Sequence, residues 1–281
     1  MGDRNQNRGS RFSGDTIKSF YYNDRMVSIQ DKQFFVREML PKGMTRGSGD
    51  PVVVFLHEGL GSVGQWKDFP AVFLEKCQMP VLLYDRLGYG KSSPRTGKRG
   101  LDYLQKEEKW LHRLLEALSV KNYFLLGHSE GGSLALIHAA SHPEGLLGVI
   151  TLSANTEEEP CITPGIEAVR RQYEKPDAKL KQALRKYHGD RCDEVFYDWC
   201  DTWTAPFFQS WNIKEALKSI AVPVLAFHGR NDQYTSLKQV ENIRQYVQGP
   251  KEIHVLAPCS HHPHFDHPHK IMEAVCRFLK R

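Results

Sequence analysis

The chain has 281 residues, of which 40% are hydrophobic, enough for one large α/β domain that carries an insertion. Its 38 Lys and Arg nearly balance its 33 Asp and Glu, and the net charge of +5 lies partly in residues 1–15, which we expect to form a flexible tail. Because no basic stripe is interleaved with aromatic side chains, the composition argues against a nucleic-acid partner.

The cysteines and the apolar residues bear on location. The six cysteines are scattered, without a C-x-x-C pair. The chain has no leading apolar segment and no apolar run of about 18 residues, the length that would span a membrane. We therefore expect a cytoplasmic protein with reduced thiols and no membrane span. These features do not predict an oligomeric state.

Strand-like and helix-like stretches alternate along the first half of the chain. Two short strands rich in β-branched and aromatic residues are expected at 26–30 and 33–40. Continuous apolar runs, the pattern of strands buried on both faces, follow at 51–58, 80–85, 122–129 and 146–153. The helical stretches between them, clearest at 101–118, predict a mostly parallel sheet covered by helices on both sides.

Residues 155–221 break this alternation. The segment is charged, has helical periodicity and contains no buried-strand run, and it is too long for an ordinary connection. We therefore predict an inserted helical cap over 155–221. Strands at 222–229 and 252–258 then resume the pattern, so the α/β core should comprise residues 16–154 and 222–281.

The sequence GHSEGG at 127–132 is the strongest motif. It matches G-x-S-x-G and lies between a buried strand and a helix, the context in which this motif exposes a nucleophilic serine on a sharp turn. Gly127 and Gly131 are needed where neighbouring backbone comes close. The turn presents the Ser129 hydroxyl and places the backbone N–H of Glu130 at a helix N-terminus, where an oxyanion collects.

A serine nucleophile needs a base, and the base needs an acid to orient it. Asp232 follows the strand at 222–229, and His261 follows the strand at 252–258. The chain order Ser129, Asp232, His261 is the order expected for this architecture, and all three fall at one edge of a parallel sheet. They form our predicted catalytic triad.

These segments resemble the α/β-hydrolase fold superfamily, and the resemblance covers nearly the whole chain outside the tail and cap. Besides GHSEGG, FLHEGLGS resembles the family's oxyanion loop, DRLGYGKS its turn after the fourth strand, GRND its acid turn and SHHPHFDHP its histidine turn. The resemblance implies an eight-stranded, mostly parallel sheet with a helical cap insertion. It makes His261 the base and implies that Asp266 starts the last helix.

One position departs from the family pattern. Glu58 stands where the family usually has glycine after the loop histidine. The second oxyanion N–H would come from Gly59 or Leu60, and Glu58 either forms a polar wall of the pocket or points to solvent. Other candidates for the pocket are His128 and three aromatic residues of the cap, which either line an apolar acyl pocket or form the cap's own core: Trp199, Trp203 and Phe207.

The histidine-rich stretch at 260–269 also permits a metal-site interpretation. It contains the sequence H-x-H-x-D-H, similar to the motif of metallo-β-lactamase-type hydrolases, at His262, His264, Asp266 and His267. That fold needs further His and Asp ligands from later strands, and only His269 follows. We therefore predict no metal and no cofactor.

The motifs predict a serine hydrolase that acts on a small acyl substrate, with a carboxylic ester as the default. The family's dehalogenases and epoxide hydrolases use aspartate in the position of Ser129, which sets them aside. Carbon–carbon bond hydrolases of the family share the same triad and remain open, as do thioesterases and aminopeptidases. A receptor that binds a small molecule without turnover is the alternative from another class.

Overall fold

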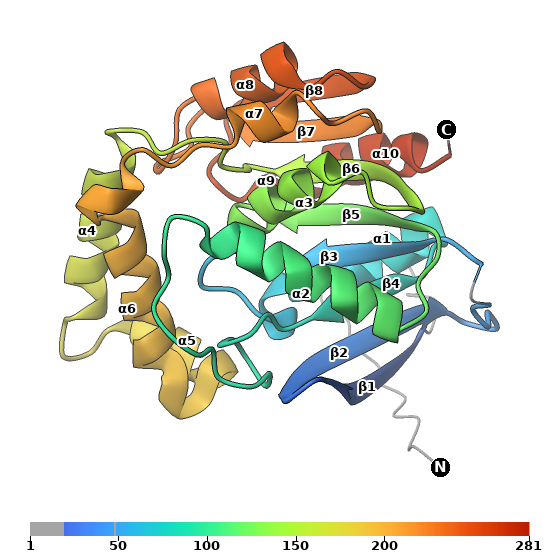
Figure 1. Cartoon of the computed structure of the whole chain (residues 1–281), viewed down its shortest axis with the longest axis horizontal. Helices are drawn as coiled ribbons and strands as arrows, with labels where there is room; N and C mark the ends of the chain where they lie inside the picture. Colours follow the sequence, from blue (N-terminus) through green and yellow to red (C-terminus); the bar gives the residue numbers. More distant parts are fainter. Residues whose placement is uncertain (1–19, 48, 281) are drawn as a thin grey trace.

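An eight-stranded sheet forms the centre of the computed structural model, which describes residues 20–47 and 49–280 (Figure 1). The predicted tail, residues 1–15, lies outside the described residues. The spatial order of the strands is β1-β2-β4-β3-β5-β6-β7-β8. Their bounds are β1 (Phe20–Ile29), β2 (Lys32–Pro41), β3 (Val52–Leu56), β4 (Val81–Tyr84), β5 (Tyr123–His128), β6 (Leu146–Leu152), β7 (Val224–Gly229) and β8 (Lys251–Leu256).

The sheet is parallel from β4 through β8, and the antiparallel β1–β2 hairpin extends it along β4. Every residue of β3, β4, β5 and β7 is buried, as continuous apolar runs require. The predicted fold class and strand number are confirmed.

Helices cover both faces of the sheet. Apolar side chains of α2 (Tyr103–Ala117), α3 (Glu130–Ala140) and α8 (Lys238–Tyr246) pack on one face, and those of α1 (Phe69–Cys77) and α10 (Pro268–Phe278) pack on the other. Short helices η1 (Val63–Trp66) and α9 (Pro263–Asp266) lie in loops. Of the helices between residues 20 and 280, none combines the length and apolar character needed to cross a membrane.

A helical segment connects β6 to β7. It contains α4 (Ile162–Tyr173), α5 (Lys179–His188), η2 (Gly189–Arg191), α6 (Cys192–Trp203), η3 (Pro206–Phe208) and α7 (Lys214–Leu217). Figure 1 shows α4, α5 and α6 standing beyond the carboxyl ends of the parallel strands. The last helix, α7, packs back against α3. A separate cap over 155–221 thus stays an interpretation, but its longer helices lie where they would cover a site at the strand ends.

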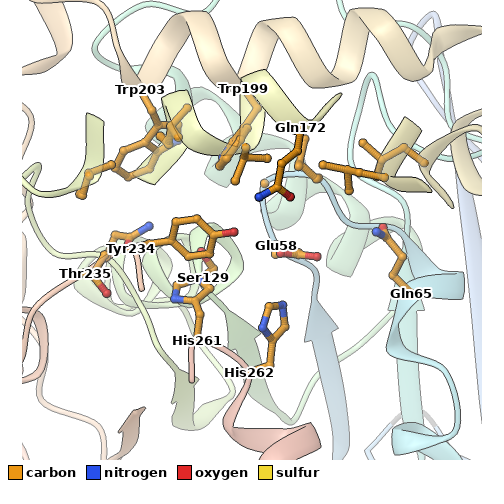
Figure 2. A pocket seen from close by; sticks show the side chains of 18 residues that line it. Glu58, Gln65, Ser129, Gln172, Trp199, Trp203, Tyr234, Thr235, His261 and His262 are labelled. Carbon is orange, nitrogen blue, oxygen red and sulfur yellow. The ribbon is translucent and has the colours of Figure 1, made fainter. Parts of the chain in front are cut away.

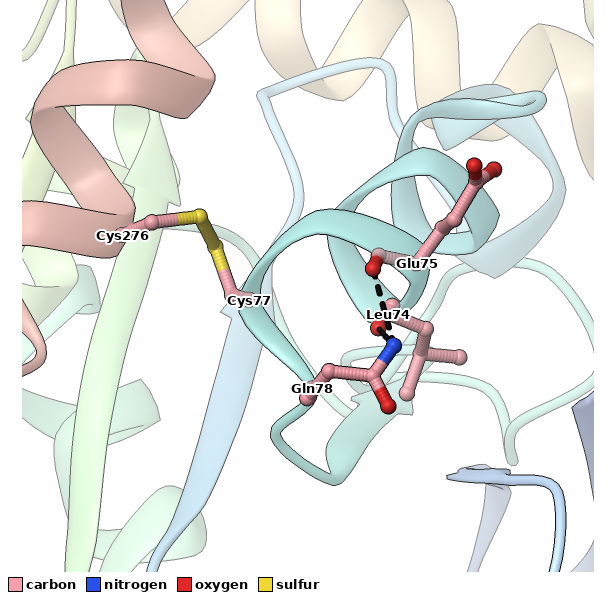
Figure 3. The surroundings of a disulfide bond; sticks show 5 residues. All are labelled: Leu74, Glu75, Cys77, Gln78 and Cys276. Atoms are coloured by element: carbon pink, nitrogen blue, oxygen red, sulfur yellow. Dashed lines mark hydrogen bonds between the residues drawn. A yellow bond between two sulfur atoms is a disulfide. The ribbon is translucent and has the colours of Figure 1, made fainter. Parts of the chain in front are cut away.

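A disulfide joins Cys77, the last residue of α1, to Cys276 in α10 (Figure 3). The prediction of reduced thiols is wrong for this pair. The two cysteines are separated by 199 positions, so no spacing rule pairs them, and they meet only because both helices pack on one face of the sheet. The expected cytoplasmic location loses one of its supports, because disulfides persist mainly in oxidising compartments.

Candidate active site

Ser129 occupies a sharp turn between β5 and α3. Its φ is 52° and its ψ is −120°, a backbone conformation that costs a non-glycine residue on the order of 1–3 kcal/mol. The Ser129 N–H donates to Leu152 O at 2.9 Å, and its carbonyl oxygen accepts from the N–H of Ser133 at 3.1 Å. The neighbouring strand and the first turn of α3 thus hold the strained residue in place.

The flanking glycines let α3 approach β3. A Cβ on Gly127 would lie 2.2 Å from Gly131 O, and a Cβ on Gly131 would lie 2.0 Å from Leu56 O. Both contacts are with backbone, which cannot turn aside. The motif therefore brings the N-terminus of α3, including the Glu130 N–H, against the end of β3.

Asp232 and His261 meet at the ends of β7 and β8. His261 Nδ1 lies 2.6 Å from Asp232 Oδ2. Asp232 Oδ1 accepts from the N–H groups of Tyr234 at 2.9 Å and Thr235 at 3.1 Å. Burial alone would raise the pKa of Asp232, but His261 and the N–H donors bring it to about 2, so Asp232 is ionised at neutral pH.

Ser129 and His261 face one cavity of about 270 Å³ (Figure 2). Glu58, Gly59 and Leu60 form part of its wall, and Figure 2 shows the Glu58 carboxylate directed into it between Ser129 and Gln65. Of the two alternatives for Glu58, the polar wall is the one observed. The opposite side is apolar and comes mainly from α4 and α5: Ile162, Ile166, Val169, Leu180 and Leu184.

The loop 57–61, which we call the oxyanion loop, lies beside the start of α3. The N–H of Glu130 is in the first turn of that helix, whose partial positive charge favours an anion. Gly59 and Leu60 are both at the cavity wall, so both predicted sources of the second N–H remain candidates.

A family model described as the alpha/beta hydrolase fold matches residues 51–189. The mouse (Mus musculus) serine hydrolase BPHL is 30% identical over 241 residues, which cover 83% of this chain and 81% of that protein. The chain belongs to the α/β-hydrolase family.

Further relatives and structures agree with this assignment. The 2-hydroxymuconate semialdehyde hydrolase of Pseudomonas sp. (strain CF600) is 25% identical over 283 residues, covering 90% of this chain and 97% of that protein. These relatives are hydrolases, which supports an enzyme of the α/β-hydrolase type. MGS-M2, an α/β-hydrolase enzyme from a Medee basin deep-sea metagenome library, superposes with a TM-score of 0.73 at 19% identity, covering 92% and 98% of the two chains, and this likeness shows the fold.

The histidine-rich stretch of this α/β-hydrolase does not gather around a metal position. Among residues 20–47 and 49–280, no three His, Cys, Asp or Glu are placed to hold a metal ion. His262 lines the cavity, whereas the His264 ring packs on Trp66 and Phe69. Burial lowers the pKa of both rings, so they are neutral at pH 7.

The family resemblance implied that Asp266 starts the last helix, and this expectation is wrong. Asp266 ends the short helix α9, and α10 begins at Pro268. Its Oδ2 accepts from the N–H of Ser260 at 2.7 Å, so the carboxylate closes the loop that carries His261.

Two of the predicted pocket residues lie outside the cavity. His128 is buried, and its Nε2 lies 2.8 Å from His261 O. Successive side chains of a strand point to opposite sides, so His128 points away from the cavity that the next residue, Ser129, faces. Phe207 sits in η3 with 49% of its surface exposed. Trp199 and Trp203 do line the cavity, while Phe196 and Phe208 are fully buried in the core, so the aromatic cluster serves both roles.

Sequence reasoning missed a buried charge cluster under the oxyanion loop. The Glu130 side chain, considered only for its backbone, accepts from Trp203 Nε1 at 2.8 Å and pairs with Arg86 at 3.2 Å and Arg99 at 3.3 Å. Glu107 pairs with Arg86 at 2.8 Å. A buried charge leaves no periodic pattern in the sequence. The available signal was Arg86 itself, which stands next to Asp85 in the DRLGYG motif.

Proposed function

We propose that this α/β-hydrolase cleaves a carboxylic ester or a related acyl substrate through an acyl-enzyme intermediate. The observation that carries the proposal is that Ser129 and His261 face the same cavity while His261 Nδ1 forms a hydrogen bond with Asp232. A nucleophile, a base and an orienting acid are the minimum set for acyl transfer by serine.

In the proposed reaction, Ser129 Oγ attacks the acyl carbon while His261 Nε2 takes the hydroxyl proton. Asp232 holds the proton on Nδ1, which keeps Nε2 free to accept. The N–H of Glu130 and that of Gly59 or Leu60 stabilise the negative oxygen. His261 then protonates the leaving group. In the second half, water gives a proton to His261 and attacks the acyl carbon, and His261 returns that proton to Ser129 Oγ as the acid is released.

The charge of the cavity argues against an anionic substrate. Among the described residues, 18 line the cavity, and Glu58 is the one member of that set that is an Asp, Glu, Lys or Arg. One relative is named for a dicarboxylate, 2-hydroxy-6-oxononadienedioate. A cavity with a carboxylate and without Arg or Lys suits a neutral or cationic substrate better. Carbon–carbon bond or thioester hydrolysis on the same triad is the second candidate.

The proposed steps use side chains and backbone of this chain, so we propose no metal and no cofactor, and a small molecule as the partner. A cytoplasmic location remains a prediction.

A fluorophosphonate probe tests the nucleophile. The wild-type chain should be labelled at Ser129, and Ser129→Ala should abolish labelling, while Ser219→Ala, at an exposed serine, should leave it unchanged. Hydrolysis of short p-nitrophenyl esters should fall by at least about 1,000-fold in Ser129→Ala and His261→Ala, and should persist with a chelator present. Intact labelling of Ser129→Ala contradicts the assignment, and a folded chain inert on every ester, thioester and C–C substrate favours a receptor.

A further inference from the structure

Three consecutive carbonyl oxygens of the oxyanion loop accept hydrogen bonds from buried side chains. Arg86 Nη2 donates to Glu58 O at 2.8 Å, and the Tyr89 hydroxyl donates to Gly59 O at 3.0 Å. His188 Nε2 donates to Leu60 O at 2.9 Å, since its Nδ1 accepts from the N–H of Gly90. The loop therefore has little freedom to rotate its peptide groups.

These contacts fix the direction of the two N–H groups that are candidates for the second oxyanion donor. In a trans peptide the C=O and the following N–H point in opposite directions. Holding Glu58 O sets the Gly59 N–H, and holding Gly59 O sets the Leu60 N–H. Arg86 and Tyr89 thus orient the two candidates for the second oxyanion donor.

The same arginine reaches the first donor. Arg86 pairs with Glu130 Oε2 at 3.2 Å, and Glu130 carries the N–H at the start of α3. Burial would raise the pKa of Glu130, but Arg99 and Arg86 hold it below its usual value, so the pair stays ionic. Arg86 therefore contacts both segments that carry the proposed donors, the oxyanion loop through Glu58 O and the start of α3 through the Glu130 side chain.

The placement of these charges argues for a role beyond stability. The side chains of Arg86, Arg99 and Glu130 are each 1% exposed. Removing such charges from water costs several kcal/mol per ion, and apolar residues of similar volume often give a fold equal or greater stability. What apolar residues cannot supply is a donor directed at a backbone carbonyl.

We propose that Arg86 and Tyr89 are positioning residues for the oxyanion hole, which hold the oxyanion loop and, through Glu130, the start of α3 at a fixed separation. The inference rests on the proposed function. It adds two residues that do not touch the substrate but set the geometry of the transition state.

The test compares Arg86→Lys with the wild-type chain in ester hydrolysis. Lysine keeps the charge but lacks the planar fork that reaches Glu58 O, Glu107 and Glu130 together. We expect kcat to fall by about 10- to 100-fold, with KM within about threefold, because a shift of about 1 Å in a catalytic donor has an effect of this size. Arg95→Lys is the matched control, since Arg95 also faces Glu107 but is bonded to Asp198 in α6.

A pair of inhibitors separates positioning from a general structural effect. A trifluoromethyl ketone adds to the serine and places its oxyanion in the hole, whereas the matching methyl ketone binds without adding. In Arg86→Lys the Ki of the first should rise by the same factor as kcat falls, and the Ki of the second should stay within about threefold. Equal losses for both inhibitors, or no loss for either, overturn the inference.

Tyr89→Phe covers the case in which Arg86→Lys does not fold, as judged by thermal unfolding. It removes only the hydroxyl that holds Gly59 O, and we expect the same selective loss at about 3- to 10-fold. A Tyr89→Phe enzyme with both inhibitor constants unchanged overturns the inference. Absence of turnover and of Ser129 labelling in the wild-type chain would instead contradict the proposed function.

Discussion

Glu58 brings a negative charge into a cavity where the family usually has a glycine. Its neighbour in the wall, His262, does not neutralise it, because burial keeps that ring uncharged at pH 7. Two unit charges about 6 Å apart interact by about 3 kcal/mol at an effective dielectric constant of about 20. The carboxylate should therefore discriminate strongly against an anionic acyl group.

We expect Glu58→Gln to relax this discrimination. Benzyl pentanoate and monobenzyl glutarate are a neutral and an anionic ester of similar length, and released benzyl alcohol reports on both. The variant should raise kcat/KM for the anionic ester by about 10- to 100-fold and change the neutral ester by less than about threefold. Glu58→Asp keeps the charge and should keep the preference. A ratio unaltered by Glu58→Gln would mean that the acyl chain binds away from this carboxylate.

The contrast between His261 and Arg86 shows what the sequence could predict at this scale. The sequence predicts His261 as the base of a triad because strand ends and chain order locate such residues before any contact is known. Arg86 acts through a backbone carbonyl 28 positions away, and a contact of that kind depends on the tertiary packing of the loop rather than on a motif. The direction of the Glu58 side chain was undecided for the same reason.

At the scale of elements, the site depends on how closely α3 approaches β3. The Gly131 Cα is directed at the last residue of β3, and a methyl group there would meet Leu56 O at 2.0 Å and His57 O at 2.6 Å. These atoms belong to the strand end and the oxyanion loop, so they cannot move without displacing the hole.

Gly131→Ala should therefore push α3 away from β3. We expect a loss of about 1–3 kcal/mol in the free energy of unfolding, and a fall in kcat of about 100-fold because the Glu130 N–H moves with the helix. Gly49→Ala is the matched control, since a Cβ there meets nothing within 4 Å. Urea unfolding and ester kinetics measure the two effects, and a Gly131→Ala enzyme with wild-type kcat would contradict this account of the motif.

At the scale of the molecule, the alternation of apolar runs and helices was sufficient to predict a mostly parallel sheet covered by helices, and the family resemblance implied its eight strands. Buried parallel strands need mainly apolar residues, and β3, β4, β5 and β7 are buried throughout, with His128 and His228 as their polar members. Contacts between segments distant in sequence were not predictable in this way. The Cys77–Cys276 pair is the clearest case, because it joins α1 to the last helix.

This disulfide closes a loop of 199 positions, and we expect it to stabilise the fold by restricting the unfolded chain. Its loss should lower the free energy of unfolding by about 2–4 kcal/mol and the Tm by about 5–10 °C. Thiol titration in denaturant should find four free thiols, Cys161, Cys192, Cys200 and Cys259, and all six after reduction.

Two variants make that expectation specific. Cys276→Ser should lower the Tm and make it insensitive to reductant, because the bond to Cys77 can no longer form. Cys161→Ser, at an exposed free cysteine, should leave the Tm within about 1 °C and remove one titratable thiol. Kinetic constants should change little in either variant below the Tm, since α1 and α10 lie on the face of the sheet opposite α3. Six free thiols in a chain purified without reductant would contradict the bond itself.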